Sequence, residues 1–165
     1  MTMCITADTH FGHDAIRRYC DRPFVTASEM DEEIVRRWNM VLGGEDAVIH
    51  LGDFALVGVG RIEELLAELD GHKILVLGNH DRSAKRMREL GFDEVYKEYE
   101  ISGIRCVHYP EHARAGEVTF AGHVHNAWDE MHRADGARIV NVGVDVHDFQ
   151  LQTLDELLGD GIISG

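Results

Sequence analysis

Polar residues of the kinds that bind cations and transfer protons follow the ends of short apolar runs in this sequence. They come from five separate stretches: Asp8 and His10, Asp53, Asn79 with His80 and Asp81, His108, and His123 with His125. Carboxylates and imidazoles are common ligands of divalent cations, and imidazole is the usual proton carrier near neutral pH. These positions predict a site for cation binding and acid–base chemistry.

The spacing within two pairs of these residues indicates that each pair faces one site. Asp8 and His10 are two residues apart, as are His123 and His125, and side chains two apart on an extended chain lie on the same face. With His80 and Asp81 set aside, seven oxygen or nitrogen donors remain, more than one cation commonly uses. We therefore expect two divalent cations that share a bridging carboxylate. A mixed oxygen and imidazole set favours manganese, with iron, zinc, nickel or magnesium as alternatives.

The first half of the sequence alternates strand-like and helix-like segments. β-prone apolar runs occupy 3–7, 47–51 and 73–77, and helical spacing covers 14–20, 28–42, 62–69 and 83–90. This alternation is typical of a parallel sheet covered by helices. Since ligands gather beyond the carboxyl ends of such strands, the five polar stretches are expected to meet there.

Strand-like runs without intervening helices fill most of the second half. They lie at 94–99, 104–108, 118–121 and 139–142, and helical spacing returns only at 154–158. The two halves together predict an α/β fold with two sheets in a single domain over 1–165, an ordinary length for one domain.

Composition narrows the possible partners. The 16 basic and 30 acidic residues give a net charge of −14, which disfavours nucleic acid and anionic membrane surfaces. No apolar run approaches the ~18 residues needed to cross a bilayer, and the N-terminus carries no signal-peptide pattern. The three cysteines have no CxxC spacing, so no disulfide framework or thiolate zinc site is expected. These features favour a cytoplasmic protein and leave the oligomeric state open.

The polar blocks, taken in order, resemble the motifs of the calcineurin-like metallophosphoesterase superfamily. The matching blocks are Asp8-Thr9-His10, Gly52-Asp53, Gly78-Asn79-His80-Asp81, His108, and Gly122-His123-Val124-His125. The ordered set is specific, whereas any single Gly-Asp or Gly-His pair is not. The resemblance implies a four-layer α/β/β/α sandwich of two mixed β-sheets flanked by helices, in agreement with the two-sheet interpretation.

The resemblance also implies a role for each polar residue. One cation would be held by Asp8, His10 and His125, and the other by Asn79, His108 and His123. Asp53 would bridge the two cations. His80 would donate a proton to the leaving group, with Asp81 as the candidate to orient its imidazole.

After Asp53 the chain departs from the protein phosphatase branch of the superfamily. That branch continues to Asp-Arg-Gly, whereas Phe54 and Ala55 follow here, so its phosphate-clamping arginine is absent. Phosphoproteins are therefore disfavoured as substrates, and the chain is more similar to small bacterial-type phosphoesterases of unassigned substrate. His13 and Arg22, which follow the first block, are candidates for substrate binding, and a structural role for Arg22 stays open.

These residues predict a metal-dependent phosphoesterase that hydrolyses small phosphate mono- or diesters. In the expected reaction, a hydroxide bridging two cations attacks in line while His80 protonates the leaving alkoxide. Two alternatives are a non-catalytic metal-binding scaffold on the same fold and a nuclease. The complete donor set with His80 argues against the scaffold, and the net acidity argues against the nuclease.

Other residues fit ordinary structural roles. His50 lies inside a predicted strand and is expected to be a hydrogen-bonded core histidine. His72, His112 and His132 fall in polar turns and are expected to be exposed. The stretch after the last strand is expected to contain a turn that requires Gly143.

Overall fold

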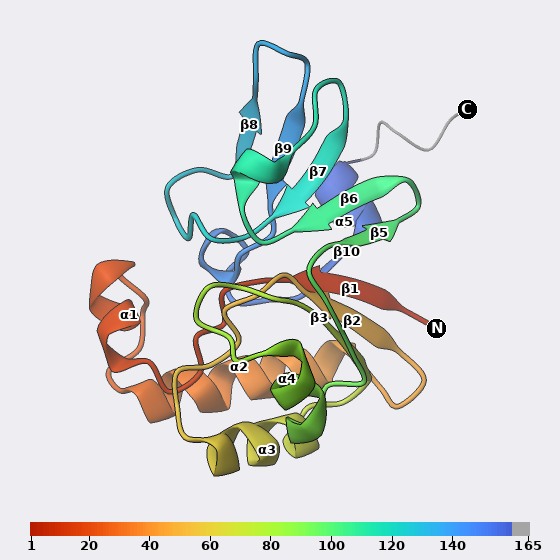
Figure 1. Cartoon of the computed structure of the whole chain (residues 1–165). Coiled ribbons are helices and arrows are strands. Elements are labelled where there is room, and N and C mark those ends of the chain that lie inside the picture. Colours follow the sequence, from red (N-terminus) through yellow and green to blue (C-terminus); the bar gives the residue numbers. More distant parts are fainter. Residues whose placement is uncertain (160–165) are drawn as a thin grey trace.

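The strands expected in the first half of the chain form most of one sheet (Figure 1). Its order is β10 (Gln152–Thr153), β1 (Met3–Thr6), β2 (Ala47–His50), β3 (His72–Val76) and β4 (Glu94–Tyr96). Strands β1 to β4 run parallel, and β10 pairs antiparallel with β1. The computed structural model describes residues 1–159, and residues 160–165 of the expected single domain lie outside this part.

A second, mixed sheet is stacked on the first (Figure 1). Its order is β5 (Tyr99–Ile101), β6 (Ile104–Val107), β7 (Val118–Ala121), β9 (Arg138–Asn141) and β8 (Glu130–His132). The three central strands run parallel, and β5 and β8 are antiparallel edge strands.

Helices cover the face of the first sheet that is turned away from the second (Figure 1). They are α2 (Ala27–Val41), α3 (Val59–Glu68) and α4 (Ala84–Leu90), and the shorter α1 (Asp14–Tyr19) precedes them. In α2, Met30, Ile34 and Trp38 recur at helical spacing and are buried in one core with Val48 of β2. None of the helices within residues 1–159 has both the length and the apolarity needed to cross a bilayer.

The two sheets enclose a second apolar core. Ile5, Ile49 and Ile74 alternate with residues that face the helices, and they join one cluster with Phe120 and Val140 of the second sheet. Helix α5 (Leu154–Leu158) adds its two terminal leucines to this cluster. The core therefore ties the second half of the chain to the first.

The outer face of the second sheet has a thinner cover. Val107, Ala121 and Ile139 pack there with Ala113 and Trp128. The helical element of this region is the 3₁₀ turn η1 (Pro110–His112), whereas the other 3₁₀ turn, η2 (Val144–Val146), packs through Val144 into the core beneath the first sheet. The expected α/β architecture of two mixed sheets flanked by helices is confirmed, with the cover of the second sheet reduced to short turns and loops.

Three details differ from the expectations for physical reasons. The run 94–99 divides into β4 and β5, which belong to different sheets because the chain crosses between them. Helix α2 begins one residue early, since the Thr26 hydroxyl caps it by accepting the Glu29 N–H at 3.1 Å. Strand β8 has no predicted counterpart, because all three of its residues are exposed and lack apolar alternation.

Candidate metal centre

The polar residues that follow the strands converge in two groups. Within each group, the ligand atoms all lie within 4.8 Å of one another. The first ligand group consists of Asp8, His10 and His125, and the second of Asp53, His108 and His123. Each group combines residues that follow β1 or β2 of the first sheet with residues that follow β6 or β7 of the second.

Asp53 lies between the two groups. Its Oδ2 atom is 3.6 Å from His10 Nε2 and 3.4 Å from His108 Nε2. His108 Nε2 is also 2.9 Å from Asn79 Oδ1, which brings Asn79 to the second group. One carboxylate oxygen thus faces an imidazole nitrogen of each group, an arrangement suited to a bridging ligand.

Two side chains of the first group contain buried polar atoms without hydrogen-bond partners among the described residues. The unpaired atoms are Asp8 Oδ1 and both ring nitrogens of His10. Burial lowers the pKa of His10 to about 3 and raises that of Asp8 to about 7. Unpaired buried polar atoms destabilise a fold, and a coordinated cation is one explanation for them. The neutral imidazole and the free carboxyl oxygen therefore fit a divalent cation.

Five of the seven predicted ligands have left-handed backbone conformations. The φ angles of Asp8, His10, Asp53, His123 and His125 lie between 49° and 73°. Such angles are uncommon outside glycine and persist where the surrounding structure enforces them. Here the Asp8 N–H donates to Gly52 O at 3.0 Å, and the His10 N–H donates to Asp53 O at 3.1 Å. These bonds join the loops after β1 and β2 and hold their side chains at one place.

Glycines let the backbone approach the ligands closely. A Cβ atom on Gly78 would lie 2.3 Å from Asp53 Oδ1, and one on Gly122 would lie 2.9 Å from Asp8 Oδ2. Gly143 has a φ of −62°, which any residue adopts, but a Cβ there would lie 3.2 Å from Asp8 Oδ2. The expected need for Gly143 therefore comes from close contact and not from the backbone angle.

Hydrogen bonds fix His108 with one nitrogen directed at the site. Its Nδ1 donates to Leu51 O at 2.7 Å, so Nε2 faces Asp53 and Asn79. Burial alone would lower the pKa of His108, but its bond to Asp53 and the charge of Asp8 raise it. Burial alone would likewise raise the pKa of Asp53, and bonds from His108 and the His80 N–H lower it instead. Asp53 is therefore ionised at neutral pH, as a metal ligand must be.

His80 presents an exposed ring beside the first group, with its centroid 5.6 Å from that of His10. Within the described residues, Asp81 makes no hydrogen bond with this ring. Its carboxylate accepts the N–H groups of Asp53, Phe54 and Gly78 at 2.9, 3.0 and 2.8 Å. Asp81 thus fastens the loop after β3 to the loop after β2, in place of the expected role of orienting His80.

His13 lies at the site, as a substrate-binding residue would. Its ring is partly exposed, and the ring centroid is 5.5 Å from that of His10. Burial and the neighbouring His80 lower its pKa. The neutral imidazole can therefore donate and accept hydrogen bonds at the rim of the first group.

Arg22 does not occupy the substrate-binding position expected from the sequence. Its side chain is fully buried, and it donates to Asp145 at 2.8 and 2.9 Å and to the carbonyls of Asp8 and Thr9 at 2.7 and 2.8 Å. A fifth contact goes to the Met30 sulfur. Because all five guanidinium N–H groups are used inside the protein, none is left for a phosphate.

Two residues beside the ligands were not predicted from the sequence. Asp145 Oδ2 is 3.4 Å from His125 Nδ1, and the Tyr109 ring lies edge-on against His108 and His123 at centroid distances of 4.8 and 4.7 Å. The signal for Tyr109 was its place directly after His108. No spacing rule connects Asp145 to Arg22, because 123 residues separate them.

The remaining histidines occupy structural or exposed positions. His50 is buried, with Nε2 at 2.9 Å from the Thr9 hydroxyl and Nδ1 accepting the Gly52 N–H at 3.2 Å. It is therefore the hydrogen-bonded core histidine expected from the sequence. His72, His112 and His132 are exposed, also as expected.

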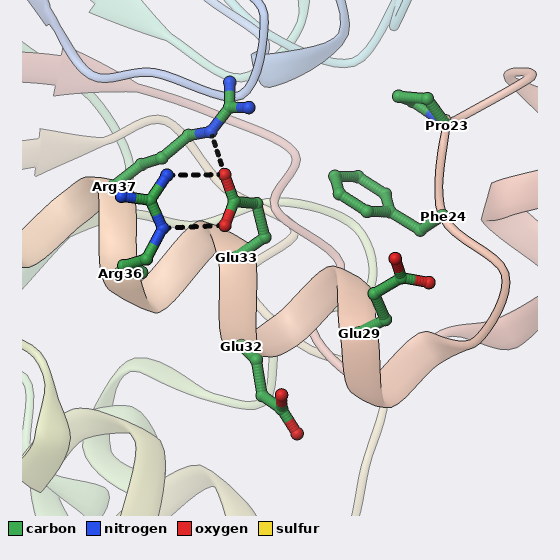
Figure 2. A pocket seen from close by; sticks show the side chains of 7 residues that line it. All are labelled: Pro23, Phe24, Glu29, Glu32, Glu33, Arg36 and Arg37. Carbon is green, nitrogen blue, oxygen red and sulfur yellow. Dashed lines mark hydrogen bonds and ion pairs between the residues drawn. The ribbon is translucent and has the colours of Figure 1, made fainter.

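A separate hollow on helix α2 shows a different arrangement of charges (Figure 2). It is lined by Pro23, Phe24, Glu29, Glu32, Glu33, Arg36 and Arg37. Glu33 binds both arginines at 2.7 Å, and Glu29 accepts the Val25 N–H at 2.7 Å. These charges are satisfied within the chain, so the hollow is not a second candidate for the chemistry.

Comparison with known proteins identifies the family. A model for the calcineurin-like phosphoesterase superfamily domain matches residues 1–152, and the chain belongs to this superfamily. An uncharacterised protein of Methanocaldococcus jannaschii is 30% identical over 158 residues, which cover 92% of this chain and 86% of that protein.

Two solved structures share the fold. A protein of unknown function from Aquifex aeolicus has a TM-score of 0.71 and 28% identity, covering 92% of this chain and 95% of its own. The nuclease MPE of Pseudomonas putida has a TM-score of 0.53 and 23% identity, covering 74% of this chain and 61% of its own. The latter likeness is one of fold alone.

Proposed function

We propose that this chain is a phosphoesterase that hydrolyses small phosphate mono- or diesters with two divalent cations, manganese foremost. The observation that carries the proposal is Asp53 Oδ2, which faces one imidazole of each ligand group at 3.6 and 3.4 Å. The unpaired buried atoms of Asp8 and His10 support it, because they lack partners among the described residues.

The first cation would be held by Asp8, His10 and His125, the second by Asn79, His108 and His123, and both by Asp53. When bound, such a pair supplies charge stabilisation of the phosphoryl group and a nucleophile at neutral pH.

The protein's own contribution to proton transfer falls to His80. Its exposed imidazole lies beside the first group and can donate a proton to the leaving oxygen. The loop that carries it is fixed by Asp81 and by the His80 N–H, which donates to Asp53 Oδ1 at 2.9 Å. His13, whose ring also lies beside that of His10, would bind an oxygen of the substrate.

The charge distribution favours small substrates. Two cations would bring four positive charges against the carboxylates of Asp8 and Asp53, so the loaded site would be locally positive on a chain with a net charge of −14. Surface charges act over about 8 to 10 Å in physiological salt. A small phosphoester avoids the acidic surface that a long polyanion would have to cross.

Metal depletion and reconstitution test the proposal. The chelator-treated protein should be inactive on p-nitrophenyl phosphate and bis-p-nitrophenyl phosphate, and adding back Mn²⁺, Fe²⁺, Zn²⁺, Ni²⁺ or Mg²⁺ in turn should restore turnover to different degrees. Asp53→Asn should lower kcat on the order of 10³-fold, since it removes several kcal/mol of transition-state stabilisation.

Asp135→Asn is the matched control, because Asp135 is an exposed turn residue paired with Arg133. It should leave kcat unchanged. Full turnover in the presence of chelator would contradict the proposal. Preferred cleavage of a single-stranded oligonucleotide, with a steep dependence on salt, would assign the site to a nuclease instead.

A further inference from the structure

Arg22, which follows α1, and Asp145 of η2 form a buried ion pair beside the site. The guanidinium binds both carboxylate oxygens, Nε to Oδ1 at 2.8 Å and Nη2 to Oδ2 at 2.9 Å. The two side chains have exposed fractions of 0% and 2%. A two-point contact between arginine and a carboxylate fixes distance and orientation together. The pair is thus a rigid connection.

Arg22 supports the loop that carries Asp8 and His10. It donates to the Asp8 carbonyl at 2.7 Å and to the Thr9 carbonyl at 2.8 Å. Asp8 and His10 have φ angles of 57° and 49°, which persist only with support from the surrounding structure. The Phe149 ring lies 5.6 Å from Arg22 Cζ and packs against the guanidinium.

Asp145 contacts a predicted ligand directly, through the 3.4 Å approach of its Oδ2 to His125 Nδ1. The Arg22 guanidinium binds both oxygens of the Asp145 side chain, so this side chain is held as a carboxylate anion. An ionised carboxylate only accepts hydrogen bonds, so a neutral His125 carries its proton on Nδ1. Nε2 then keeps the lone pair that a cation requires.

We infer that Arg22 and Asp145 are a positioning pair that sets the tautomer and orientation of His125 and couples it to the Asp8–His10 loop. The inference rests on the proposed function, in which His125 is a ligand of the first cation. Asp145 also neutralises Arg22, so this arginine does not repel a cation nearby. Loss of Asp145 would leave an uncompensated buried charge beside the first group.

The main test is the Asp145→Asn variant, which keeps the side-chain volume and removes the charge. We expect it to fold, as judged by circular dichroism, and to bind the Mn²⁺ of the first group about 10- to 100-fold more weakly in competition with a chelator. At limiting Mn²⁺, kcat should fall while KM changes little, and excess Mn²⁺ should restore turnover.

Two further measurements do not depend on that variant. Arg22→Lys keeps the charge without the two-point contact and should weaken Mn²⁺ binding less, in the same direction. In the wild-type protein, ¹⁵N NMR should find the His125 proton on Nδ1.

Lys73→Met is the matched control, because it removes a buried cation at the N-terminal end of β3, away from the site. It should leave Mn²⁺ affinity unchanged.

The outcomes separate this inference from the proposed function. Unchanged Mn²⁺ affinity in Asp145→Asn, or a proton on His125 Nε2, would overturn the positioning role while the wild-type protein still binds two cations and hydrolyses phosphoesters. A wild-type protein that binds no cation would overturn the proposed function, and the positioning role with it.

Discussion

The two ligand groups each combine two buried residues with one half-buried histidine, but they differ in hydrogen bonding and in the exposed Asn79, which joins the second group alone. In the first, Asp8 and His10 have exposed fractions of 0% and 2% and contain the unpaired buried atoms. In the second, Asn79 is exposed, His123 is half-buried, and His108 already shares a 2.9 Å contact with Asn79. The first group thus contains buried atoms that lack a hydrogen-bond partner among the described residues, whereas the second contains none.

The difference predicts which group binds its cation more tightly. Buried ligand atoms without a hydrogen-bond partner gain the most from a cation, so we expect the first group to hold its cation more tightly. The exposed Asn79 gives solvent access to the second group, which should exchange its cation more readily.

The largest expected effect comes from removing one ligand of each group. His10→Ala should weaken the tighter Mn²⁺ on the order of 10³-fold, because leaving a buried cation without one of its ligands costs about 3 to 5 kcal/mol. Asn79→Ala should weaken the looser Mn²⁺ about tenfold, the equivalent of about 1.4 kcal/mol. Chelator competition measures both affinities, and a reversed order would break the comparison.

His80→Ala should separate cation binding from proton transfer. Its ring lies beside the first group but belongs to neither, so both Mn²⁺ affinities should stay unchanged. Turnover of alkyl phosphates, whose alkoxides are poor leaving groups, should fall about 10²-fold, while turnover of p-nitrophenyl phosphate should change little. Equal losses on both substrates would remove His80 from the role of general acid.

The Mn²⁺ affinity of both ligand groups should also depend on pH, which is a smaller effect than the loss of a ligand. Burial raises the pKa of Asp8 to about 7, and the pKa of His108 is raised by Asp53 and Asp8 despite its burial. Asp8 is therefore protonated below about pH 7, His108 keeps its proton to higher pH than an ordinary histidine, and each must release its proton to a cation. Affinity for the cation of the first group should fall about tenfold per pH unit below about pH 7, and protonation of His108 should weaken the other cation in the same direction.

Calorimetric titration in buffers of different ionisation enthalpy counts the released protons. We expect about two protons per loaded chain at about pH 6. Release of a single proton would show that only one of the two groups titrates.

Tyr109→Leu should produce the smallest effect and should act on the second group alone. The variant removes edge-on contacts with His108 and His123, which are worth about 0.5 to 1.5 kcal/mol. The affinity for the looser Mn²⁺ should fall about threefold. Tyr109→Phe keeps the ring and is the control. An effect on the tighter Mn²⁺ would show that the groups are not independent.

The sequence best predicted the elements that have a clear apolar periodicity and the polar residues that follow them. Helix α2 follows from the spacing of Met30, Ile34 and Trp38, and the strand ends follow from apolar runs that stop at a polar residue. The seven predicted ligands lie together because parallel strands place their carboxyl ends at one edge. Their roles as ligands stay predictions.

Long-range contacts and exposed edges could not be predicted in this way. The partner of Arg22 is set by tertiary packing between the first and last loops, so its sequence neighbours gave no sign of Asp145. Asp81 adjoins His80 in sequence, yet the local turn directs its carboxylate to the amides of another loop. Strand β8 is an exposed edge and leaves no apolar pattern to detect.

Each ligand group combines residues that follow strands of both sheets, so two bound cations would link the two sheets to each other. Separation of the sheets would then require release of the cations. The melting temperature should therefore rise with the logarithm of the free cation concentration. Neither the chain up to β4 nor the chain from β5 onward contains a complete group. Cation binding would therefore require that the two halves of the molecule have docked.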